Sequence, residues 1–326
     1  MIRSFVFSQG KLVGQDLGLD FLKMVLFDED AQVWVDIGQS TEEEAKSVLE
    51  GVFNFHPLAI EDCIQPSDRP KIDEYDNYIF VVIHAVDFSS SLHEFCTTEL
   101  NMFIGKNFLL TYHGEAIRSI SSTIERVLKN SAAVARAPDR LTYTILDFLL
   151  DNYDPAVEDL THDFDELESQ VLTSPGPDIL ERVIHLKTQV RRLRQIMAPQ
   201  REVISRLARG EFKQVRAHML PYYRDLLDRL VRINDLTENY RDQLTDTLQV
   251  HLNLQQMQVN KVIKVLTVLA TLSLPFVAIT SFYGMNIKHM PNTDWPSWEL
   301  AYGYIFAITA VITLVIYYLL KRQKWL

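Results

Sequence analysis

The sequence contains few cysteines and few basic residues. Its 326 residues include only two cysteines, Cys63 and Cys96, too few for a disulfide-built secreted scaffold or a zinc ribbon. The 32 Lys and Arg against 43 Asp and Glu give a formal charge of −11. No nucleic acid partner is expected, because affinity for a phosphate backbone comes from Lys and Arg. The first residues also lack the long apolar core of a signal peptide. These features predict an acidic protein facing a reducing compartment.

Charged residues are nearly absent from two long apolar stretches. Residues 262–283 contain one charge, Lys264 near one end, and residues 300–320 contain none. A helix needs about 20 apolar residues to cross a bilayer core about 30 Å thick, so both stretches predict transmembrane helices. Buried core helices are the weaker alternative, because they seldom run this long without a polar face. The mean hydropathy of −0.02 therefore averages a polar front and an apolar end.

The basic residues beside these stretches predict their orientation. Lys261 and Lys264 stand at the start of the first span, and Lys321, Arg322 and Lys324 follow the second. Lysine and arginine accumulate on the cytoplasmic side of a membrane, so both chain ends are predicted to be cytoplasmic. The sequence thus predicts a multi-pass protein of the cell (inner) membrane, in contact with lipid.

The residues ahead of the spans predict a cytoplasmic α/β domain over residues 1–137. Five short β-prone runs occur there: Arg3–Phe7, Val33–Ile37, Ile79–Val86, Thr98–Ile104 and Phe108–Tyr112. Thr41 and Glu44 have the spacing of a capping box, which predicts a helix start. A short helical turn is expected from His56 to Cys63, beginning at Pro57.

Helical periodicity replaces the strand pattern from about Pro138 onward. Helical runs are predicted over 139–172, which is acidic, and 177–208, which is basic, forming a cytoplasmic helical hairpin over 138–210. Pairing between the two helices and two separately solvated faces are equally good interpretations. The other predicted segments are a stalk helix over 211–261, transmembrane helix 1 over 262–283 as its continuation, an extracytoplasmic loop over 284–299, transmembrane helix 2 over 300–320 and a cytoplasmic tail over 321–326.

Two spans cannot enclose a pore within one subunit. The pair is therefore either an anchor or one part of an oligomer whose first spans line a shared axis. Three features favour assembly: an apolar stripe along the stalk, Pro275 inside the first span, and polar residues on one face of that span. The polar residues are Asn260, Thr267, Thr271 and Ser281, and polar groups in lipid usually face protein or water.

The first span ends in Tyr283-Gly284-Met285-Asn286, and here the chain resembles the CorA family of magnesium channels. That family carries Gly-Met-Asn directly after its penultimate span. The resemblance extends to Met290-Pro291, the closing Lys-Trp-Leu, the stalk residues 221–225, and the segments 56–62 and 69–71. It implies a funnel-shaped homo-oligomeric channel, a homopentamer, in which an α/β cytoplasmic domain precedes a long stalk helix and two transmembrane helices.

The resemblance also implies a function. It points to membrane-potential-driven uptake of Mg²⁺, gated by intracellular Mg²⁺, with no enzymatic activity and no cofactor. A Zn²⁺, Co²⁺ or Ni²⁺ transporter of the same fold is the first alternative. A membrane-anchored cytoplasmic sensor domain, whose spans only anchor it, is the second. The loop departs from the family pattern, because Lys288 and His289 precede Met-Pro and Asn292 follows it, where acids are common. The preferred ion therefore stays open.

The family pattern assigns roles to eight residues, and we add a ninth, Asp87, as a predicted partner. Gly284, Met285 and Asn286 match the selectivity filter, where Asn286 carbonyls could accept hydrogen bonds from the waters that Mg²⁺ retains. Asn260 matches a polar ring at the cytoplasmic side of the pore, and Ile263, Leu266 and Leu274 match a hydrophobic constriction. Asp225 matches a carboxylate that helps to bind regulatory Mg²⁺ between neighbouring subunits, and Asp87 is the partner we predict.

One further group could bind a softer metal ion. His84, Asp87, His93 and Glu94 lie close together in the sequence of the cytoplasmic domain. Zinc prefers nitrogen and sulfur ligands, but ordinary surface positions are the stronger expectation for these four residues.

Overall fold

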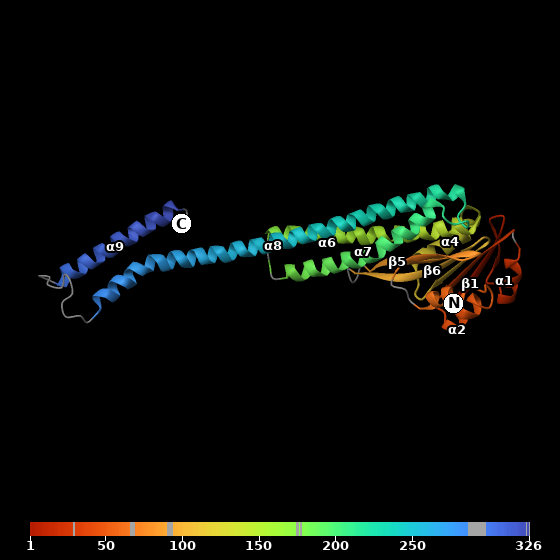
Figure 1. The fold of residues 1–326 in the computed structure, drawn as a ribbon, viewed down its shortest axis with the longest axis horizontal. Helices are drawn as coiled ribbons and strands as arrows, with labels where there is room; N and C mark the ends of the chain where they lie inside the picture. The colour runs from red at the N-terminus through yellow and green to blue at the C-terminus, as the bar shows by residue number, and fades with distance from the viewer. Residues whose placement is uncertain are drawn as a thin grey trace. The chain divides into compact units, whose positions relative to one another are not determined.

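The structure, a computed structural model, describes residues 1–28, 30–65, 69–89, 94–173, 176, 178–285, 298–323 and 325. Side chains are described over the same ranges except at 87–89, 94–96, 298 and 301. The chain divides into two compact units, Met1–Leu248 and Gln249–Leu326. The sheet and most of the helices belong to the first unit (Figure 1).

The first unit is built on a seven-stranded sheet with the order β2-β1-β3-β7-β6-β5-β4. The strands are β1 (Ile2–Ser8), β2 (Lys11–Gln15), β3 (Ala31–Gly38), β4 (Lys71–Glu74), β5 (Tyr78–Ser89), β6 (Glu94–Gly105) and β7 (Phe108–His113). Strand β3 runs parallel to β7, and the other neighbours are antiparallel. All five predicted strands are confirmed. The sequence missed β2 and β4, because edge strands of five and four residues carry too few alternations to form a pattern.

Three short helices lie on one face of the sheet: α1 (Leu19–Leu26), α2 (Glu42–Leu49) and α3 (Pro57–Ile64). Their apolar residues share a core with the strands, in which the Phe55 ring stacks on Phe103 with centroids 4.1 Å apart. The predicted capping box starts α2: the Glu44 amide donates to Thr41 Oγ1 at 3.3 Å, and the Thr41 amide donates to Glu44 Oε2 at 3.1 Å. The predicted turn at Pro57 is also confirmed, as helix α3.

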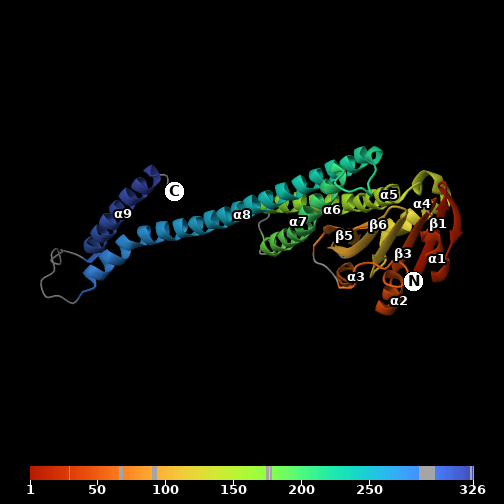
Figure 2. The same cartoon turned by 45° about the vertical axis from the view of Figure 1, so that its right-hand side comes forward.

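Longer helices follow the sheet in sequence: α4 (Arg118–Val134), α5 (Pro138–Asp151), α6 (Tyr153–Thr173) and α7 (Ile179–Arg209). Figure 2 shows α5, α6 and α7 across the sheet from α2 and α3. The sequence did not predict α4. The single helix predicted over 139–172 is wrong, since the chain breaks at Asn152. Pro155 gives the physical reason, because proline lacks an amide hydrogen and fits only the first turn of a helix, where α6 places it.

Helices α6 and α7 form the predicted hairpin. Arg182 of α7 bonds Glu166 of α6 at 2.9 Å, so pairing between the two helices does occur. Other charged residues of the hairpin form ion pairs outside it. Arg194 of α7, for example, lies 3.3 Å from Glu238, which comes after the hairpin in the chain. The pairing interpretation therefore holds for Arg182 and Glu166, whereas Arg194 pairs outside the hairpin. Helix α7 ends at Gly210, whose φ of 72° favours glycine.

After a single 3₁₀ turn (Ala217–Met219), helix α8 runs without interruption from Leu220 to Tyr283. Its 64 residues correspond to about 96 Å at 1.5 Å per residue. The prediction that the stalk continues into the first span is therefore confirmed. Within the first unit α8 buries Tyr223, Leu226, Leu230 and Ile233, so the apolar stripe of its first turns is covered by the chain's own helices.

The second unit consists of the rest of α8 and helix α9 (Trp298–Arg322). Both helices contain windows apolar enough to cross a membrane, with mean hydropathies of 2.2 and 2.1. Only 11% and 6% of these windows is buried, whereas core helices of a soluble protein would be mostly buried. The alternative of two buried core helices is therefore wrong for the described residues.

Candidate functional site

The predicted filter begins at the end of α8. Gly284 and Met285 follow the helix directly, and Asn286 lies outside the described residues. The Gly284 amide donates to the Thr280 carbonyl at 2.9 Å. A Cβ on Gly284 would lie 3.0 Å from that same oxygen, which is closer than side chains normally approach. Lack of room therefore favours glycine here, while Met285 is half exposed beside it.

The other predicted pore residues all lie on α8. At about 100° per residue, Asn260, Ile263 and Leu274 share one face of the helix, and Leu266 lies about a quarter turn from its centre. The apolar residues among them are largely exposed: Ile263 is 54% exposed, Leu266 65% and Leu274 67%. Asn260 is also exposed, and its Oδ1 accepts a hydrogen bond from Gln256 Nε2 at 3.0 Å. This face is therefore open to contact with lipid, water or another chain.

The threonines on the same face change one argument for assembly. Thr267 and Thr271 donate their hydroxyl hydrogens to the carbonyls of Ile263 and Thr267, both at 2.8 Å. A hydroxyl bonded back to its own helix costs little in lipid. These hydrogen bonds weaken the argument that the two threonines need protein or water, and which surface they face stays a prediction. Pro275 leaves a polar group of the span without its usual partner, because proline has no amide hydrogen to donate to the Thr271 carbonyl. The argument for assembly from Pro275 therefore stands.

The predicted regulatory residue Asp225 is exposed on α8. Its charge raises the pKa of two α5 side chains, Tyr143 and Asp147, for which burial is the largest cause. Asp147 also feels the nearby charge of Asp151, while the Arg229 guanidinium opposes the rise in its pKa. Asp225 therefore stands beside other carboxylates of its own subunit.

Arg229 is the cation within this group of carboxylates. It bonds Asp147 Oδ1 at 3.1 Å and Asp151 Oδ1 at 2.6 Å, and lies 3.7 Å from Asp154. We call Asp147, Asp151, Asp154 and Asp225 the α8 acidic cluster. Among the described residues, Arg229 and Arg126, which also acts on Asp147, are fewer than the four carboxylates, so an excess of negative charge remains. Sequence reasoning missed Asp147, although its four-residue spacing from Asp151 places both on one helix face.

Asp87 lies in β5, opposite Cys96. Its side chain falls outside the described residues, so its pairing with Asp225 stays a prediction. Within the proposed soft-metal set, His93 and the side chain of Glu94 are also outside the described residues. His84 is described and is only 7% exposed, so the expectation of a surface position is wrong for it. It is anchored by its backbone, which donates to Gln200 Oε1 at 3.1 Å and accepts from the Tyr153 hydroxyl at 2.7 Å.

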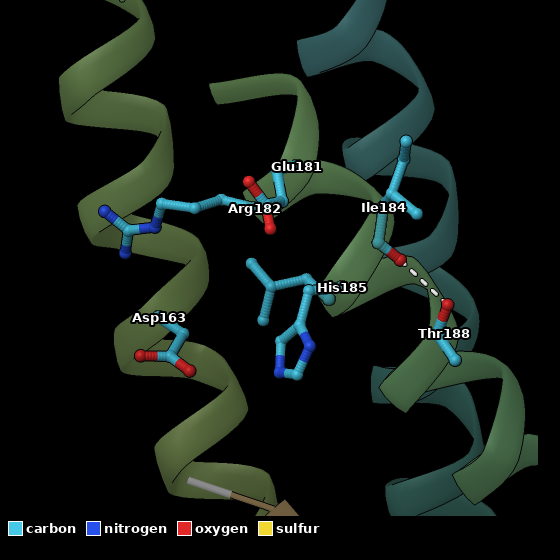
Figure 3. Close-up of a pocket in the computed structure, with 7 residues that line it drawn as sticks. Asp163, Glu181, Arg182, Ile184, His185 and Thr188 are labelled. Carbon is cyan, nitrogen blue, oxygen red and sulfur yellow. Dashed lines mark hydrogen bonds between the residues drawn. The ribbon is translucent and has the colours of Figure 1, made fainter. Parts of the chain in front are cut away.

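A different group of potential metal ligands lies on α6. In the described part of the chain, His162, Asp163 and Glu166 are the one set with three ligand atoms within 4.8 Å of one another. Figure 3 shows Arg182 reaching from α7 toward α6 near Asp163. Its hydrogen bond and charge lower the pKa of Glu166, which therefore stays ionised with its negative charge already balanced by the guanidinium. A cation would have to displace this guanidinium, so an ion pair explains the group better than a metal centre does.

Comparisons with known proteins agree with this architecture. Residues 29–322 match the family model described as "CorA-like Mg2+ transporter protein". The chain is 30% identical over 300 residues to the "Cobalt/magnesium transport protein CorA" of Thermotoga maritima, covering 92% of this chain and 85% of that protein. It is 24% identical over 266 residues to the "Zinc transport protein ZntB" of Yersinia pseudotuberculosis, covering 80% and 78%.

A solved structure shares the fold. The complete CorA magnesium transporter of Methanocaldococcus jannaschii superposes with a TM-score of 0.80 at 21% identity, covering 99% of this chain and 98% of that chain. The soluble α/β region, the long stalk helix and the two candidate membrane helices therefore follow a known arrangement.

Proposed function

The chain belongs to the CorA-like Mg²⁺ transporter family, and we propose that it forms a homopentameric channel carrying Mg²⁺ into the cytoplasm. Transport of divalent cations is the function that its family shares. The observation that carries the finer proposal is the position of Gly284-Met285-Asn286, directly at the end of the apolar helix α8. The cell (inner) membrane, with both termini in the cytoplasm, is the proposed location.

The chemistry of Mg²⁺ supports Asn286 as the filter residue. Mg²⁺ gives up its water reluctantly, so a filter has to bind a largely hydrated ion. A ring of Asn286 carbonyls would accept hydrogen bonds from this water. A ring of carboxylates would bind the ion more tightly, and conduction requires binding weak enough for release. The membrane potential supplies the driving force, about 4.6 kcal/mol for a divalent ion per 100 mV, so transport needs neither an enzymatic step nor a resident cofactor.

We assign the rest of the pathway to one face of α8. Asn260 forms the polar ring toward the cytoplasm, and Ile263, Leu266 and Leu274 form the hydrophobic constriction. Their exposure in the single chain supports this assignment, because residues that line a shared axis are not covered by their own subunit. A ring of apolar side chains can close such a pore by excluding water.

Regulation is proposed to act through Asp225. Mg²⁺ bound between Asp225 of one subunit and Asp87 of its neighbour would favour the closed state, and its loss would release the subunits. The excess negative charge of the α8 acidic cluster supports cation binding at this place. Limited proteolysis over a series of Mg²⁺ concentrations is the measurement that tests it.

The filter assignment is tested by Mg²⁺ uptake into proteoliposomes. We expect Asn286→Ala to reduce the uptake rate at least about tenfold, equivalent to roughly 1.4 kcal/mol. Asn292→Ala is the matched control, since it removes the same amide from the same loop outside the motif, and its rate should equal that of the wild type. Unchanged uptake by Asn286→Ala would show that Asn286 is not the filter residue.

The same assay decides between ions. Zinc remains the second candidate, because the chain is similar to a protein named for zinc transport. Parallel measurements with Zn²⁺, Co²⁺ and Ni²⁺ would favour that alternative if any of these ions entered faster than Mg²⁺ at equal concentration.

A further inference from the structure

The hairpin of α6 and α7 carries two flanks of opposite charge. On α7, Lys187, Arg191 and Arg194 follow at steps of four and three residues, which places them on one face of the helix. On α6, Glu158 and Asp165 are seven residues apart and also share a face. All are exposed except Arg194, which is half-buried. We call the first set the α7 basic flank and the second the α6 acidic flank.

The α7 basic flank has little counter-charge within its own chain. Arg194 lies 3.3 Å from Glu238 of α8. In the described part of the chain, the side chains of Lys187 and Arg191 have no hydrogen bond or ion pair. Two of the three cations are therefore available to a partner.

The α6 acidic flank is unpaired in the same way. The carboxylates of Glu158 and Asp165 have no hydrogen bond or ion pair with any residue that the structure describes. His162 is the exposed histidine between them in the sequence, and it groups with Asp163 and Glu166 instead. Both carboxylates therefore keep their full negative charge toward solvent or a partner.

The two flanks lie on opposite sides of α8, which runs beside the hairpin in Figures 1 and 2. Thr161, one helical step from Glu158 on the acidic flank, has its hydroxyl 2.6 Å from the Tyr240 hydroxyl of α8. The basic flank contacts α8 through Arg194 and Glu238. At about 100° per residue, Tyr240 and Glu238 are about 200° apart around α8. One side of the unit is thus basic and the other acidic, so copies can pair side by side, head to tail.

Pairing in a ring requires the opposite charges to lie at equal heights. In a closed ring about an axis along the hairpin, each copy is rotated but not shifted. Arg182 of α7 defines the heights, because it bonds both Glu166 and Gln170 of α6. The two helices are antiparallel, so each step forward from Arg182 on α7 corresponds to a step back on α6.

The charges match by this count. Lys187, five residues beyond that arginine, is level with the turn of α6 that ends at Asp165. Arg191, nine residues beyond it, is level with the turn that includes Glu158. Each unpaired cation therefore has an unpaired carboxylate at its own height on the opposite side of the unit.

Exposed apolar side chains continue both flanks toward the tip of the hairpin. Leu172 is 65% exposed and lies seven residues beyond Asp165, and Leu180 is 46% exposed and lies seven residues before Lys187. Leu180 is two residues before Arg182, so it is level with the turn that ends at Leu172. Exposed apolar surface rimmed by charge is typical of a protein contact. The flanks therefore match in apolar surface as well as in charge.

We propose that the α7 basic flank of one copy packs against the α6 acidic flank of the next copy in a ring of this chain. Arg191 pairs with Glu158 of the neighbour, Lys187 pairs with its Asp165, and the exposed leucines meet beyond them. An anionic lipid surface would cover the basic flank alone, whereas a second copy covers both. Exposed ion pairs contribute little energy each, so their role is to select the neighbouring flank and its height. The inference rests on the proposed homo-oligomer and names one of its contacts.

Cross-linking of a cysteine pair tests the proposal on the full chain in detergent. Asp165→Cys combined with Lys187→Cys, treated with a short bismaleimide reagent, should give a ladder of covalent multimers on a denaturing gel. Only a link between copies adds mass, and each single variant, which retains the native cysteines, should remain a monomer on the gel. A bismaleimide is needed because paired long side chains hold two helices further apart than a disulfide can span.

Charge reversal within this double-cysteine chain tests the other ion pair. Arg191→Glu should slow multimer formation about fivefold, because it places like charges together. Adding Glu158→Arg should restore the rate, since the pair re-forms with its signs exchanged. Arg192→Glu is the matched control: it reverses the neighbouring exposed arginine, about 100° around the helix, and should leave the rate unchanged.

Light scattering and Mg²⁺ uptake on the same samples separate this inference from the proposed function. An oligomeric mass without covalent multimers would overturn this contact and leave the homo-oligomer standing, whereas a monomeric mass would overturn both. Multimers without Mg²⁺ uptake would support the contact and contradict the channel. The pairing would also be overturned if Glu158→Arg failed to restore the rate. It would equally be overturned if Arg191→Glu left cross-linking unchanged but removed a thermal stabilisation by phosphatidylglycerol, since the basic flank would then be a lipid site.

Discussion

A buried ion pair lies at adjacent ends of β3 and β7. His113 Nε2 lies 3.2 Å from Asp36 Oδ1, and its Nδ1 lies 2.6 Å from the Glu115 carbonyl. Both ring nitrogens face acceptors, which favours the doubly protonated, positively charged form of the ring. Burial lowers the pKa of His113, as does the N-terminal ammonium group. The hydrogen bond to Asp36, the charge of Asp36 and the hydrogen bond to the Glu115 carbonyl together outweigh them and raise it.

This pair makes the stability of the first unit depend on pH. A raised pKa means that the stabilisation is complete below the unfolded value of about 6.5 and is lost as pH rises through the folded value. The unfolding temperature should therefore fall as pH is raised above about 6.5. Trp34 provides the fluorescence signal, because it is the one tryptophan in the sequence of this unit. It is also linked to the ion pair: its Nε1 donates to Thr111 Oγ1, and the Thr111 hydroxyl donates to Asp36 Oδ1.

His113→Gln is the variant that tests this dependence. It should destabilise the unit by about 3–5 kcal/mol below pH 6.5, the usual cost of breaking a buried pair, and remove most of the pH dependence. His185→Gln replaces an exposed histidine on α7 and should keep the wild-type profile. A wild-type unfolding temperature that rose between pH 6.5 and 9 would contradict the assigned charge of His113.

At the scale of single residues, the sequence predicts those residues whose role depends on local spacing. Thr41 and Glu44 are three positions apart and form the capping box without help from the rest of the chain. Asn101 and His113 could not be predicted, because their burial depends on strands that meet only in the folded sheet. Asp139 is similar: it is 2% exposed and bonds Arg216 Nη2 at 2.6 Å, 77 positions along the chain.

At the scale of elements, α8 is tied to α5 near its start. Asp139 of α5 accepts from the backbone and the guanidinium of Arg216, and its carbonyl accepts from the Tyr223 hydroxyl at 2.8 Å. Arg229, six residues beyond Tyr223, bonds Asp147 and Asp151. The part of α8 that carries Asp225 is thus held by contacts before and after it in the chain, at Tyr223 and at Arg229. A cation bound at Asp225 would therefore act on the helix that continues into the first span.

Protease protection tests the proposed role of Asp225. In the wild type, cleavage of the first unit should slow as Mg²⁺ rises through the millimolar range, because the proposed regulatory Mg²⁺ would bridge subunits. Asp225→Ala should remove this protection. Asp228→Ala is the matched control, since it removes an exposed carboxylate three residues further along the same helix, and it should keep the protection. Equal protection in Asp225→Ala and the wild type would contradict the assignment.

Element boundaries were predictable where the sequence contains a strong signal. The continuous α8 followed from a long run without glycine, whose only proline before the span lies in its first turn. The break between α5 and α6 also had a signal, Pro155, but the apolar period runs through it and suggested one helix. The short edge strands β2 and β4 gave no comparable signal, because pairing with longer neighbours stabilises them.

At the scale of the whole molecule, the charge and the apolar surface lie in different parts of the chain. The whole excess of acidic over basic residues lies ahead of the spans, where 41 Asp and Glu stand against 27 Lys and Arg. Carboxylates also gather around the start of α8. The second unit exposes apolar side chains along α8 and α9. An acidic region joined by one helix to a candidate membrane span is suited to attracting cations.

The central claim is that this chain conducts Mg²⁺ along the membrane potential. The most direct test reconstitutes the wild-type protein in K⁺-loaded liposomes that contain a Mg²⁺-sensitive dye, and imposes an inside-negative potential with valinomycin. Mg²⁺ influx should begin with the potential, increase as it is made more negative, and stop when external K⁺ removes it. Influx equal to that of protein-free liposomes at every potential would contradict the claim and favour a membrane-anchored sensor.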